Sequence, residues 1–430
     1  MHIIDGNNPS LDKIFQRTVA DEKRIANQVN EIIEMVRVTG DQAICRFNRR
    51  FSGCMLTPEQ LLVTNEEREF AYQSVDAGYL DALRLAKENI TVFHQKQIER
   101  SWFQTGKNGV LLGQMIRPLQ RVGIYVPGGK AAYPSSVLMN AIPALLAGVP
   151  EIVMVTPPDE QGRVNPFILV AASELGLEVI YKAGGAQAIA ALAYGTELLP
   201  GVDKITGPGN VYVTYAKRQV FGKVDIDMLA GPSEVLIIAD ESANPVYIAA
   251  DLLSQAEHDE MSAVVLLTPC RALAGQVMDE ITAQAKLLSK QHIINSSLEN
   301  HGAIVVTEGL EQAFELANRY APEHLELMIE APFDWLDRVE NAGAVFMGHY
   351  SPEPVGDYLA GPNHILPTSG TARFNSALGV DSFIKKTSVV SYTPAGLQGV
   401  SEQLIRLAEV EDFTAHANAV RVRLSNTKAN

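Results

Sequence analysis

The chain has 430 residues, of which 47% are hydrophobic and 20% charged, a composition typical of a soluble globular protein with two or three domains. The net charge of −15 argues against binding to nucleic acid or to anionic membrane surfaces. Three cysteines are too few for a disulfide framework and indicate a reducing compartment. We expect no secretory signal at the N-terminus and no membrane span, hence a cytoplasmic enzyme that acts on small molecules.

The first hundred residues have a charge-rich, helical pattern. A capping box at Thr64–Glu67 predicts a helix that begins there and extends toward Gln97. From about residue 110, short β-branched segments alternate with helical ones. The predicted strands cover residues 122–126, 151–155, 178–181, 235–239, 263–267, 303–306, 325–328 and 344–347. The predicted helices between them cover residues 136–147, 166–175, 186–194, 245–258, 272–289 and 310–319.

This alternation predicts an α/β fold built from two parallel-sheet units, because near-continuous apolar strands need helices on both faces. Residues 350–371 are rich in Pro and Gly, which predicts an ordered loop. The last 35 residues have a polar, helical pattern, typical of a tail that docks on another surface.

Three glycine clusters lie in the first alternating unit. Their sequences are Tyr125-Val126-Pro127-Gly128-Gly129, Ala183-Gly184-Gly185-Ala186-Gln187 and Gly207-Pro208-Gly209-Asn210. Glycine at a strand-to-helix turn lets backbone N–H groups approach a phosphate. No complete G-x-G-x-x-G is present, so each cluster alone is more typical of a tight turn, and only their grouping makes a phosphate site an equal alternative.

Metal-ligating side chains are scattered rather than clustered in a known motif. Gln255 and His258 stand three residues apart at the end of a predicted helix, which places them on one face. Asp357 and His364 belong to the predicted loop, and His416 follows Glu411 in the tail. Each of these residues also has an ordinary structural explanation, and the chain lacks C-x-x-C and H-E-x-x-H.

An acid–base pair is the remaining candidate. Glu323 and His324 directly precede the strand predicted at 325–328, where both side chains can reach one cleft. A carboxylate can polarise water while a histidine moves protons near neutral pH. A solvated or helix-capping pair is the alternative interpretation.

Seven motifs in order resemble the histidinol dehydrogenase family over about residues 20 to 425. They are the three glycine clusters, Leu229-Ala230-Gly231-Pro232-Ser233-Glu234-Val235, Leu252-Leu253-Ser254-Gln255-Ala256-Glu257-His258, Ala321-Pro322-Glu323-His324-Leu325, and Gly356-Asp357-Tyr358-Leu359-Ala360-Gly361-Pro362-Asn363-His364. The resemblance implies two incomplete Rossmann-like parallel-sheet units with helical N-terminal and C-terminal segments. The implied division is an N-terminal helical segment at 1–22, a metal and catalytic α/β domain at 23–124 and 233–378, an NAD-binding α/β domain at 125–232, and a C-terminal helical segment at 379–430 that docks on a partner subunit.

The resemblance also implies the chemistry, which is zinc-dependent oxidation of L-histidinol to L-histidine through the aldehyde, with two hydride transfers to NAD. It assigns acid–base catalysis to Glu323 and His324. The implied zinc ligands are Gln255, His258, Asp357 and His416, with His416 supplied by the partner in a homodimer. The implied NAD contacts are Tyr125, Gln187 and Asn210. The implied substrate contacts are Ser233, Gln255, His258, His324, Asp357, Glu411 and His416.

One departure from the family keeps an alternative open. The family often carries Pro within two positions after the residue matching His258, whereas this chain continues Asp259-Glu260-Met261. A paralogous zinc/NAD dehydrogenase acting on another small amino or polyol alcohol is therefore the first alternative. A zinc hydrolase with purely structural glycine turns is the second, and a non-catalytic dimer is the third.

Overall fold

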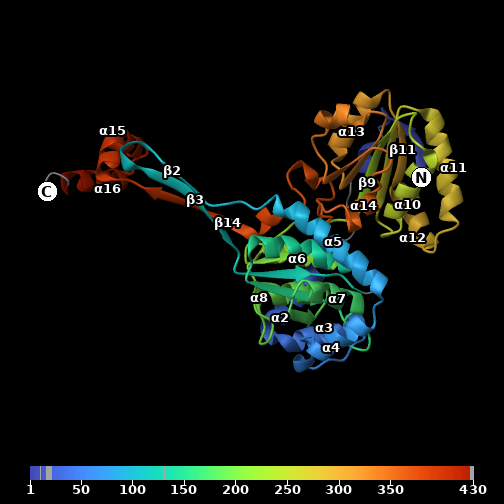
Figure 1. The fold of residues 1–430 in the computed structure, drawn as a ribbon, viewed down its shortest axis with the longest axis horizontal. Coiled ribbons are helices and arrows are strands. Elements are labelled where there is room, and N and C mark those ends of the chain that lie inside the picture. Colours follow the sequence, from blue (N-terminus) through green and yellow to red (C-terminus); the bar gives the residue numbers. More distant parts are fainter. Residues whose placement is uncertain (10, 16–21, 129–131, 427–430) are drawn as a thin grey trace. The chain divides into compact units, whose positions relative to one another are not determined.

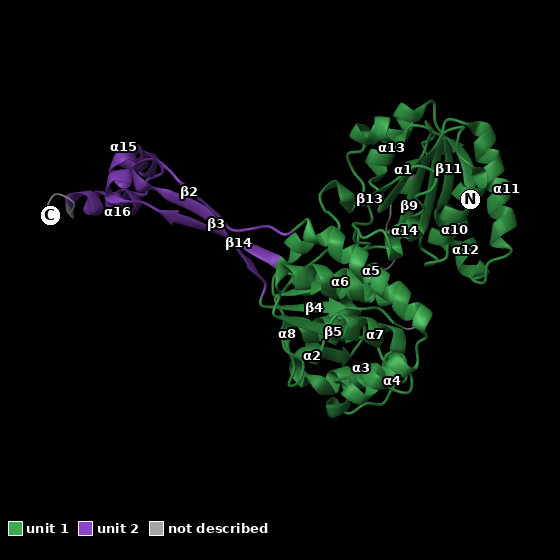
Figure 2. Ribbon diagram, viewed as in Figure 1, with its two compact units in different colours: residues 1–97, 120–383 green, residues 98–119, 384–430 purple. Residues whose placement is uncertain are grey.

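The computed structural model describes residues 1–9, 11–15, 22–128 and 132–426. The chain forms two compact units, unit 1 (residues 1–97 and 120–383) and unit 2 (residues 98–119 and 384–430), shown in green and purple in Figure 2. Gly129 of the first glycine cluster lies outside the described residues, as do residues 16–21 of the expected N-terminal segment and the last four residues of the tail. Among the helices that are described, none is both long and apolar enough to cross a membrane.

Unit 1 contains two parallel β-sheets. The first has six strands in the order β1 (His2–Asp5), β11 (Gly302–Val306), β10 (Ala263–Thr268), β9 (Glu234–Ala239), β12 (His324–Met328) and β13 (Ala344–Met347). The second has five strands in the order β6 (Val179–Lys182), β5 (Glu151–Thr156), β4 (Arg121–Tyr125), β7 (Lys204–Thr206) and β8 (Asp225–Ile226). In both sheets every strand pairing is parallel, as the alternating pattern predicts.

The six-stranded sheet is buried on both faces because successive strand residues point to opposite sides. Val235 and Ile237 of β9 face one hydrophobic cluster, and Leu236 and Ile238 face the other. The first cluster is closed by α10 (Pro245–Ala256), α11 (Arg271–Ala285) and α12 (Gln291–His301), and the second by α1 (Leu11–Phe15) and α13 (Leu310–Tyr320). Figure 1 shows α11 and α13 on opposite sides of the sheet.

The five-stranded sheet has the same sandwich arrangement. One face packs on α2 (Glu22–Thr39), α3 (Asp41–Ser52), α8 (Gly185–Tyr194) and α9 (Val211–Val220). Other helices of this region are α6 (Pro134–Ala147), which packs on β4, and α7 (Pro166–Glu174), α4 (Asn65–Gln73) and α5 (Ala77–Gln95). This arrangement places the amino ends of α8 and α9 beside the carboxyl ends of β6 and β7.

Unit 2 is an antiparallel sheet followed by two helices. Its strands are β2 (Trp102–Thr105), β3 (Leu111–Pro118) and β14 (Ile384–Ser391), with β3 in the middle. The helices α15 (Pro394–Val410) and α16 (Thr414–Asn426) pack on each other. Many large apolar side chains of this unit are solvent-exposed, including Trp102, Phe103, Leu112, Val390, Leu407, Val410, Phe413 and Val422.

The predicted α/β class and parallel sheets are confirmed, whereas several element boundaries differ. The Thr64 capping box is present, but the helix ends at Gln73 and Asp76 caps a second one, because the Asp76 carboxylate accepts the N–H of Tyr79. Part of the expected loop at 350–371 is a short helix, α14 (Glu353–Tyr358), which begins just after Pro352. The prediction did not include β1, β7, β8, α9, α12 or any strand of unit 2.

Candidate active site

Glu323 and His324 lie at the amino end of β12, the strand between β9 and β13 in the six-stranded sheet. His324 is the first residue of β12 and stands opposite Val235 of β9 and Ala344 of β13. Both side chains are buried, with only 7% of Glu323 and 4% of His324 exposed. Ser233, an expected substrate contact, directly precedes β9 at the same edge. The structure therefore buries this pair in the sheet edge, which argues against a solvated turn.

Backbone hydrogen bonds to Glu234 hold both side chains in place. The Glu323 carboxylate Oε2 accepts the N–H of Glu234 at 2.8 Å, and His324 Nδ1 lies 2.9 Å from the Glu234 carbonyl oxygen. Because a carbonyl only accepts, Nδ1 carries the proton of the neutral ring and Nε2 has a free lone pair. His324 Nδ1 also lies 3.6 Å from Glu323 Oε2. One strand end thus orients an acid and a base together.

Burial shifts the pKa of each group toward its neutral form. Desolvation raises the pKa of Glu323 well above its usual range, with the charges of Glu234, Asp357 and Glu353 adding to the rise. Desolvation also lowers the pKa of His324, against the opposing effect of Asp357. A histidine kept neutral accepts a proton, and a carboxylate with a raised pKa is a stronger base than a solvated one.

A possible metal site lies next to this pair. Ligand atoms of His258, Glu353 and Asp357 lie within 4.8 Å of one another. His324 Nε2 is 3.8 Å from Glu353 Oε1, which connects the cluster to the acid–base pair. Nitrogen and carboxylate oxygen are ligands that Zn²⁺ accepts in proteins. The structure therefore brings together two of the expected ligands, His258 and Asp357, from segments about a hundred residues apart.

Gln255 belongs to the same segment as His258. It lies in the last turn of α10, and the His258 N–H donates to its carbonyl oxygen at 3.3 Å. Its side chain is 1% exposed, and neither Oε1 nor Nε2 has a hydrogen-bond partner among the described residues. A buried amide without partners is costly, so this position calls for a bound group. Nearby, His364 Nδ1 lies 3.0 Å from the Asp357 carbonyl oxygen.

Three buried carboxyl groups of this region were absent from the sequence-based prediction. Glu353 precedes Asp357 by four residues in α14, the spacing that places two side chains on one helix face, and this spacing was the available signal. Glu326 of β12 accepts the N–H of Glu353 at 3.1 Å and shares a hydrogen bond with Asp251 of α10. Desolvation raises the pKa of all three carboxyl groups. Two carboxyl groups in a hydrogen bond share a proton. The contact between Asp251 and Glu326 joins two separate elements, so no local sequence pattern predicts it.

Glu411 and His416 belong to unit 2. Glu411 caps the end of α15, and His416 lies in the first turn of α16 with its ring 5.0 Å from that of Phe413. Both residues are solvent-exposed in the single chain. Within unit 1, the described structure provides His258, Asp357 and the nearby Gln255 of the expected ligand set.

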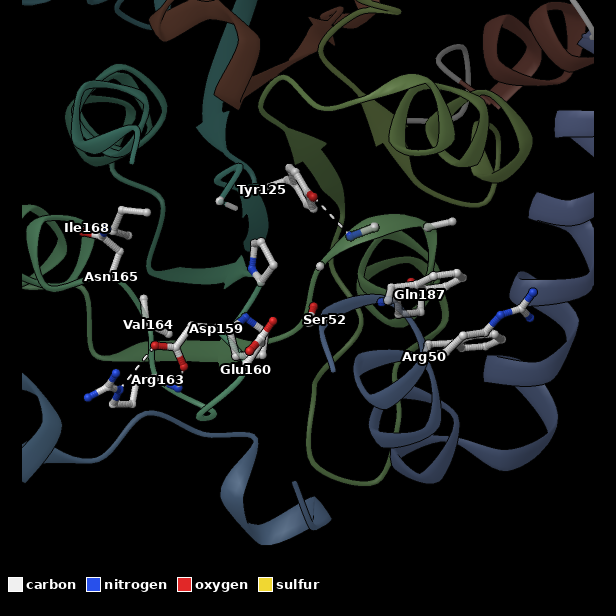
Figure 3. A pocket seen from close by; sticks show the side chains of 18 of the residues that line it. Arg50, Ser52, Tyr125, Asp159, Glu160, Arg163, Val164, Asn165, Ile168 and Gln187 are labelled. Carbon is white, nitrogen blue, oxygen red and sulfur yellow. Dashed lines mark hydrogen bonds and ion pairs between the residues drawn. The ribbon is translucent and has the colours of Figure 1, made fainter. Parts of the chain in front are cut away.

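A separate cavity of about 1340 Å³ lies at the carboxyl ends of β4, β6 and β7. Tyr125, Gln187 and Asn210, one from each glycine cluster, line it, together with side chains of α2, α3 and α4. Figure 3 shows Tyr125, Gln187 and Arg50 of α3 around this cavity. The Tyr125 hydroxyl accepts the N–H of Gly185 at 3.1 Å, which joins the first two clusters. Ligands of parallel α/β sheets bind beyond the carboxyl ends of the strands, so this cavity has the position of a cofactor site.

Gln187 and Asn210 are prepared for further hydrogen bonds. Gln187 is 2% exposed, and its Oε1 has no partner among the described residues. Asn210 caps α9, since its Oδ1 accepts the N–H groups of Tyr212 and Val213 at 3.1 and 3.2 Å. The Asn210 amide nitrogen then remains available as a donor at the helix N-terminus, where the macrodipole favours an anion.

Comparison with known proteins identifies the family of this chain. Residues 15–424 match the family model described as histidinol dehydrogenase. The chain is 52% identical to the histidinol dehydrogenase of Heliobacterium mobile over 418 residues, covering 97% of this chain and 98% of that one. It is 53% identical to the histidinol dehydrogenase of Carboxydothermus hydrogenoformans, and the match covers 99% of this chain and 100% of that one. The crystal structure of histidinol dehydrogenase from Elizabethkingia anophelis superposes with a TM-score of 0.94 at 40% sequence identity. The superposition covers 99% of this chain and 98% of that one. The chain belongs to the histidinol dehydrogenase family.

Proposed function

We propose that this protein oxidises L-histidinol to L-histidine through the aldehyde, with zinc and NAD as its cofactors. The observation that carries the proposal is the buried Glu323–His324 pair beside the cluster of His258, Glu353 and Asp357. The pair supplies acid–base groups, the cluster supplies metal ligands, and relatives at about half identity are named histidinol dehydrogenase. As an oxidoreductase of this family, the protein belongs to histidine biosynthesis.

The residues present fit both cofactors. An imidazole, a carboxylate and the unpartnered Gln255 amide form a nitrogen and oxygen donor set that suits zinc. We propose that His258, Gln255 and Asp357 hold the metal together with His416 of a second copy of the chain. Tyr125, Gln187 and Asn210 line a cavity large enough for a dinucleotide, which we propose as the NAD site. When bound, zinc anchors the amine and imidazole nitrogens of the substrate, and NAD accepts the hydride in each oxidation.

The chain's own residues then handle protons and water. His324 Nε2 takes the hydroxyl proton of the alcohol, because its Nδ1 is occupied by the Glu234 carbonyl. For hydration of the aldehyde, the ionised carboxylate of Glu323, which its raised pKa makes a stronger base than a solvated carboxylate, removes a proton from the attacking water. Protonated His324 returns its proton to the aldehyde oxygen and is neutral again. His324 takes the hydroxyl proton of the hydrated aldehyde in the second oxidation. Burial of both groups excludes bulk water from the reacting carbon.

We further propose a homodimer with a shared active site. The exposed apolar side chains of unit 2 leave Ala408, Ala417 and Val420 among its few buried hydrophobic residues, which is a small core for a separate unit. A second copy of the chain covers these surfaces and receives Glu411 and His416 at its own metal site. Substrate contacts proposed on this basis are Ser233, Gln255, His258, His324, Asp357, Glu411 and His416.

The decisive experiment counts products with purified protein, zinc, NAD and L-histidinol. We expect two NADH for each L-histidine formed, and no conversion when NAD is omitted. Turnover without NAD is the result expected of a zinc hydrolase. Normal NADH production with other amino or polyol alcohols and none with histidinol would identify a paralogous dehydrogenase instead.

A further inference from the structure

A buried ion pair joins Lys217 of α9 to Asp227, the residue that follows β8, in the part of unit 1 that holds the cavity of about 1340 Å³. Only 3% of the Lys217 side chain and 1% of the Asp227 side chain are exposed. The ammonium group and the carboxylate are in direct contact. Neither residue belongs to the described lining of the cavity, so any effect on a bound molecule must pass through other residues.

Two further hydrogen bonds of the pair converge on one glycine. Lys217 Nζ donates to the Gly207 carbonyl oxygen at 3.0 Å, and Asp227 Oδ2 accepts the Gly207 N–H at 2.8 Å. Asp227 Oδ1 also accepts the N–H of Met228 at 2.6 Å. Both backbone polar groups of Gly207 are thus held by charged, buried partners, the strongest kind of hydrogen bond available to a loop.

Gly207 is also the point where the third glycine cluster meets the first. Its φ is +111°, and a Cβ atom added there would lie 2.1 Å from the carbonyl oxygen of Tyr125. Only glycine permits this conformation and this approach. Three residues later, Asn210 caps α9, the helix that carries Lys217. A fixed Gly207 therefore fixes the spacing between Tyr125 and Asn210.

We propose that Lys217 and Asp227 are positioning residues that set the geometry of the cofactor site through Gly207. The inference rests on the proposed function, in which Tyr125 and Asn210 contact NAD. A buried ion pair seldom stabilises a fold more than well-packed apolar side chains would, because desolvation offsets the attraction. Here its hydrogen bonds hold Gly207, at which the first and third glycine clusters meet, and an apolar pair cannot make these hydrogen bonds.

The first test is Lys217→Met, with NAD binding measured by calorimetry in the full-length protein. We expect the dissociation constant for NAD to rise roughly tenfold or more, since small displacements of binding groups have effects of this size. The KM for histidinol should change much less than the KM for NAD. Lys204→Met is the matched control, because Lys204 bonds Asp225 and the Ser382 carbonyl and leaves Gly207 untouched. It should retain wild-type affinity for NAD.

A double variant separates positioning from stability. Lys217→Met alone leaves Asp227 buried without its counter-ion, so it should unfold at a lower temperature. Combining it with Asp227→Asn removes the unpaired charge and should recover much of that temperature, while the Gly207 carbonyl still lacks its donor. NAD affinity should therefore stay low in the double variant.

Two results would overturn the inference while leaving the proposed function intact. One is wild-type NAD affinity in Lys217→Met, and the other is a double variant whose NAD affinity returns in step with its melting temperature. If the wild-type protein itself fails to bind NAD, the proposed function is wrong and the inference is overturned with it.

Discussion

His324 and Glu323 are adjacent in sequence but perform separable tasks in the proposed reaction. Both oxidations require removal of a hydroxyl proton, whereas only the second requires an added water. His324→Ala should therefore lose about 10²–10⁴-fold in rate with either histidinol or histidinal, the usual contribution of a general base. Glu323→Gln should lose most with histidinal, and it should release the aldehyde when histidinol is supplied.

Steady-state kinetics with both substrates and trapping of the aldehyde test this division. Each variant should keep the wild-type melting temperature within a few degrees, which serves as the folding control. Equal losses with both substrates in Glu323→Gln would contradict the division, and the pair would then act as one coupled unit.

Glu326 is a second residue whose chemistry depends on burial. Its pKa is raised by desolvation and by the neighbouring Asp251, so the folded protein retains a proton that the unfolded chain loses as pH rises above about 4. The folded state then binds more protons than the unfolded one, and stability falls with increasing pH. Each pKa unit of such a shift corresponds to about 1.4 kcal/mol.

Glu326→Gln removes this titration while its amide still donates to Asp251 and accepts from the Glu353 N–H. The variant should match the wild type near pH 4 and exceed its melting temperature by a few degrees at pH 8. Thermal unfolding across this range is the measurement, and Glu311→Gln, at an exposed helical position, controls for loss of a negative charge. A constant difference between wild type and Glu326→Gln at all pH values would show that the carboxyl is ionised in both states.

Among the elements, α9 combines a structural cap with a proposed cofactor contact in one residue. Asn210→Ala removes the cap and should cost about 1 kcal/mol in stability, together with NAD affinity. Asn210→Asp keeps an acceptor for the N–H groups of Tyr212 and Val213 but removes the amide donor and adds a charge that repels phosphate. We expect this variant to retain wild-type stability and to bind NAD more weakly.

Thermal unfolding and calorimetric NAD titration of the two Asn210 variants distinguish these effects. If Asn210→Asp binds NAD as well as the wild type, the Asn210 amide has no role in cofactor binding and the residue is only a helix cap.

Local patterns predicted many of the elements of unit 1 because most of its longer strands are apolar and because helices such as α7 and α10 begin at an Asn cap followed by Pro. The strands of unit 2 were missed because Trp102–Thr105 and Ile384–Ser391 are largely exposed and show no alternation between apolar and polar residues. The pairing of Ile384–Ser391 with Leu111–Pro118 also joins segments more than 260 residues apart, and no short-range pattern encodes such a contact.

The sites show the same limit. The glycine clusters could be read locally, since each ends a strand. The proximity of His258 and Asp357 could not be predicted from local sequence, because it depends on α10 and α14 converging at the amino ends of β9 and β12. This edge is opposite to the one where ligands of parallel sheets usually bind, so position in the fold alone would not have indicated a site there. The resemblance to a known family supplied what the local patterns lacked.

For the whole molecule, the proposed sharing of active sites gives a quantitative expectation. Each site would combine Glu323 and His324 of one chain with His416 of the other. His416→Asn should abolish activity and weaken zinc binding while leaving the chain folded. A second variant, with Glu323→Gln and His324→Ala combined, should be inactive for a different reason.

Mixing these two inactive proteins under conditions that exchange subunits should restore activity. Half of the dimers formed at random are hybrids, and each hybrid has one site with all functional residues and one site with none, so about a quarter of wild-type activity should appear. Distinct affinity tags on the two variants allow the hybrids to be purified, which verifies exchange and should raise the recovered activity to about half. If purified hybrids remain inactive although they bind zinc, each active site is completed within one chain and His416 does not cross between subunits.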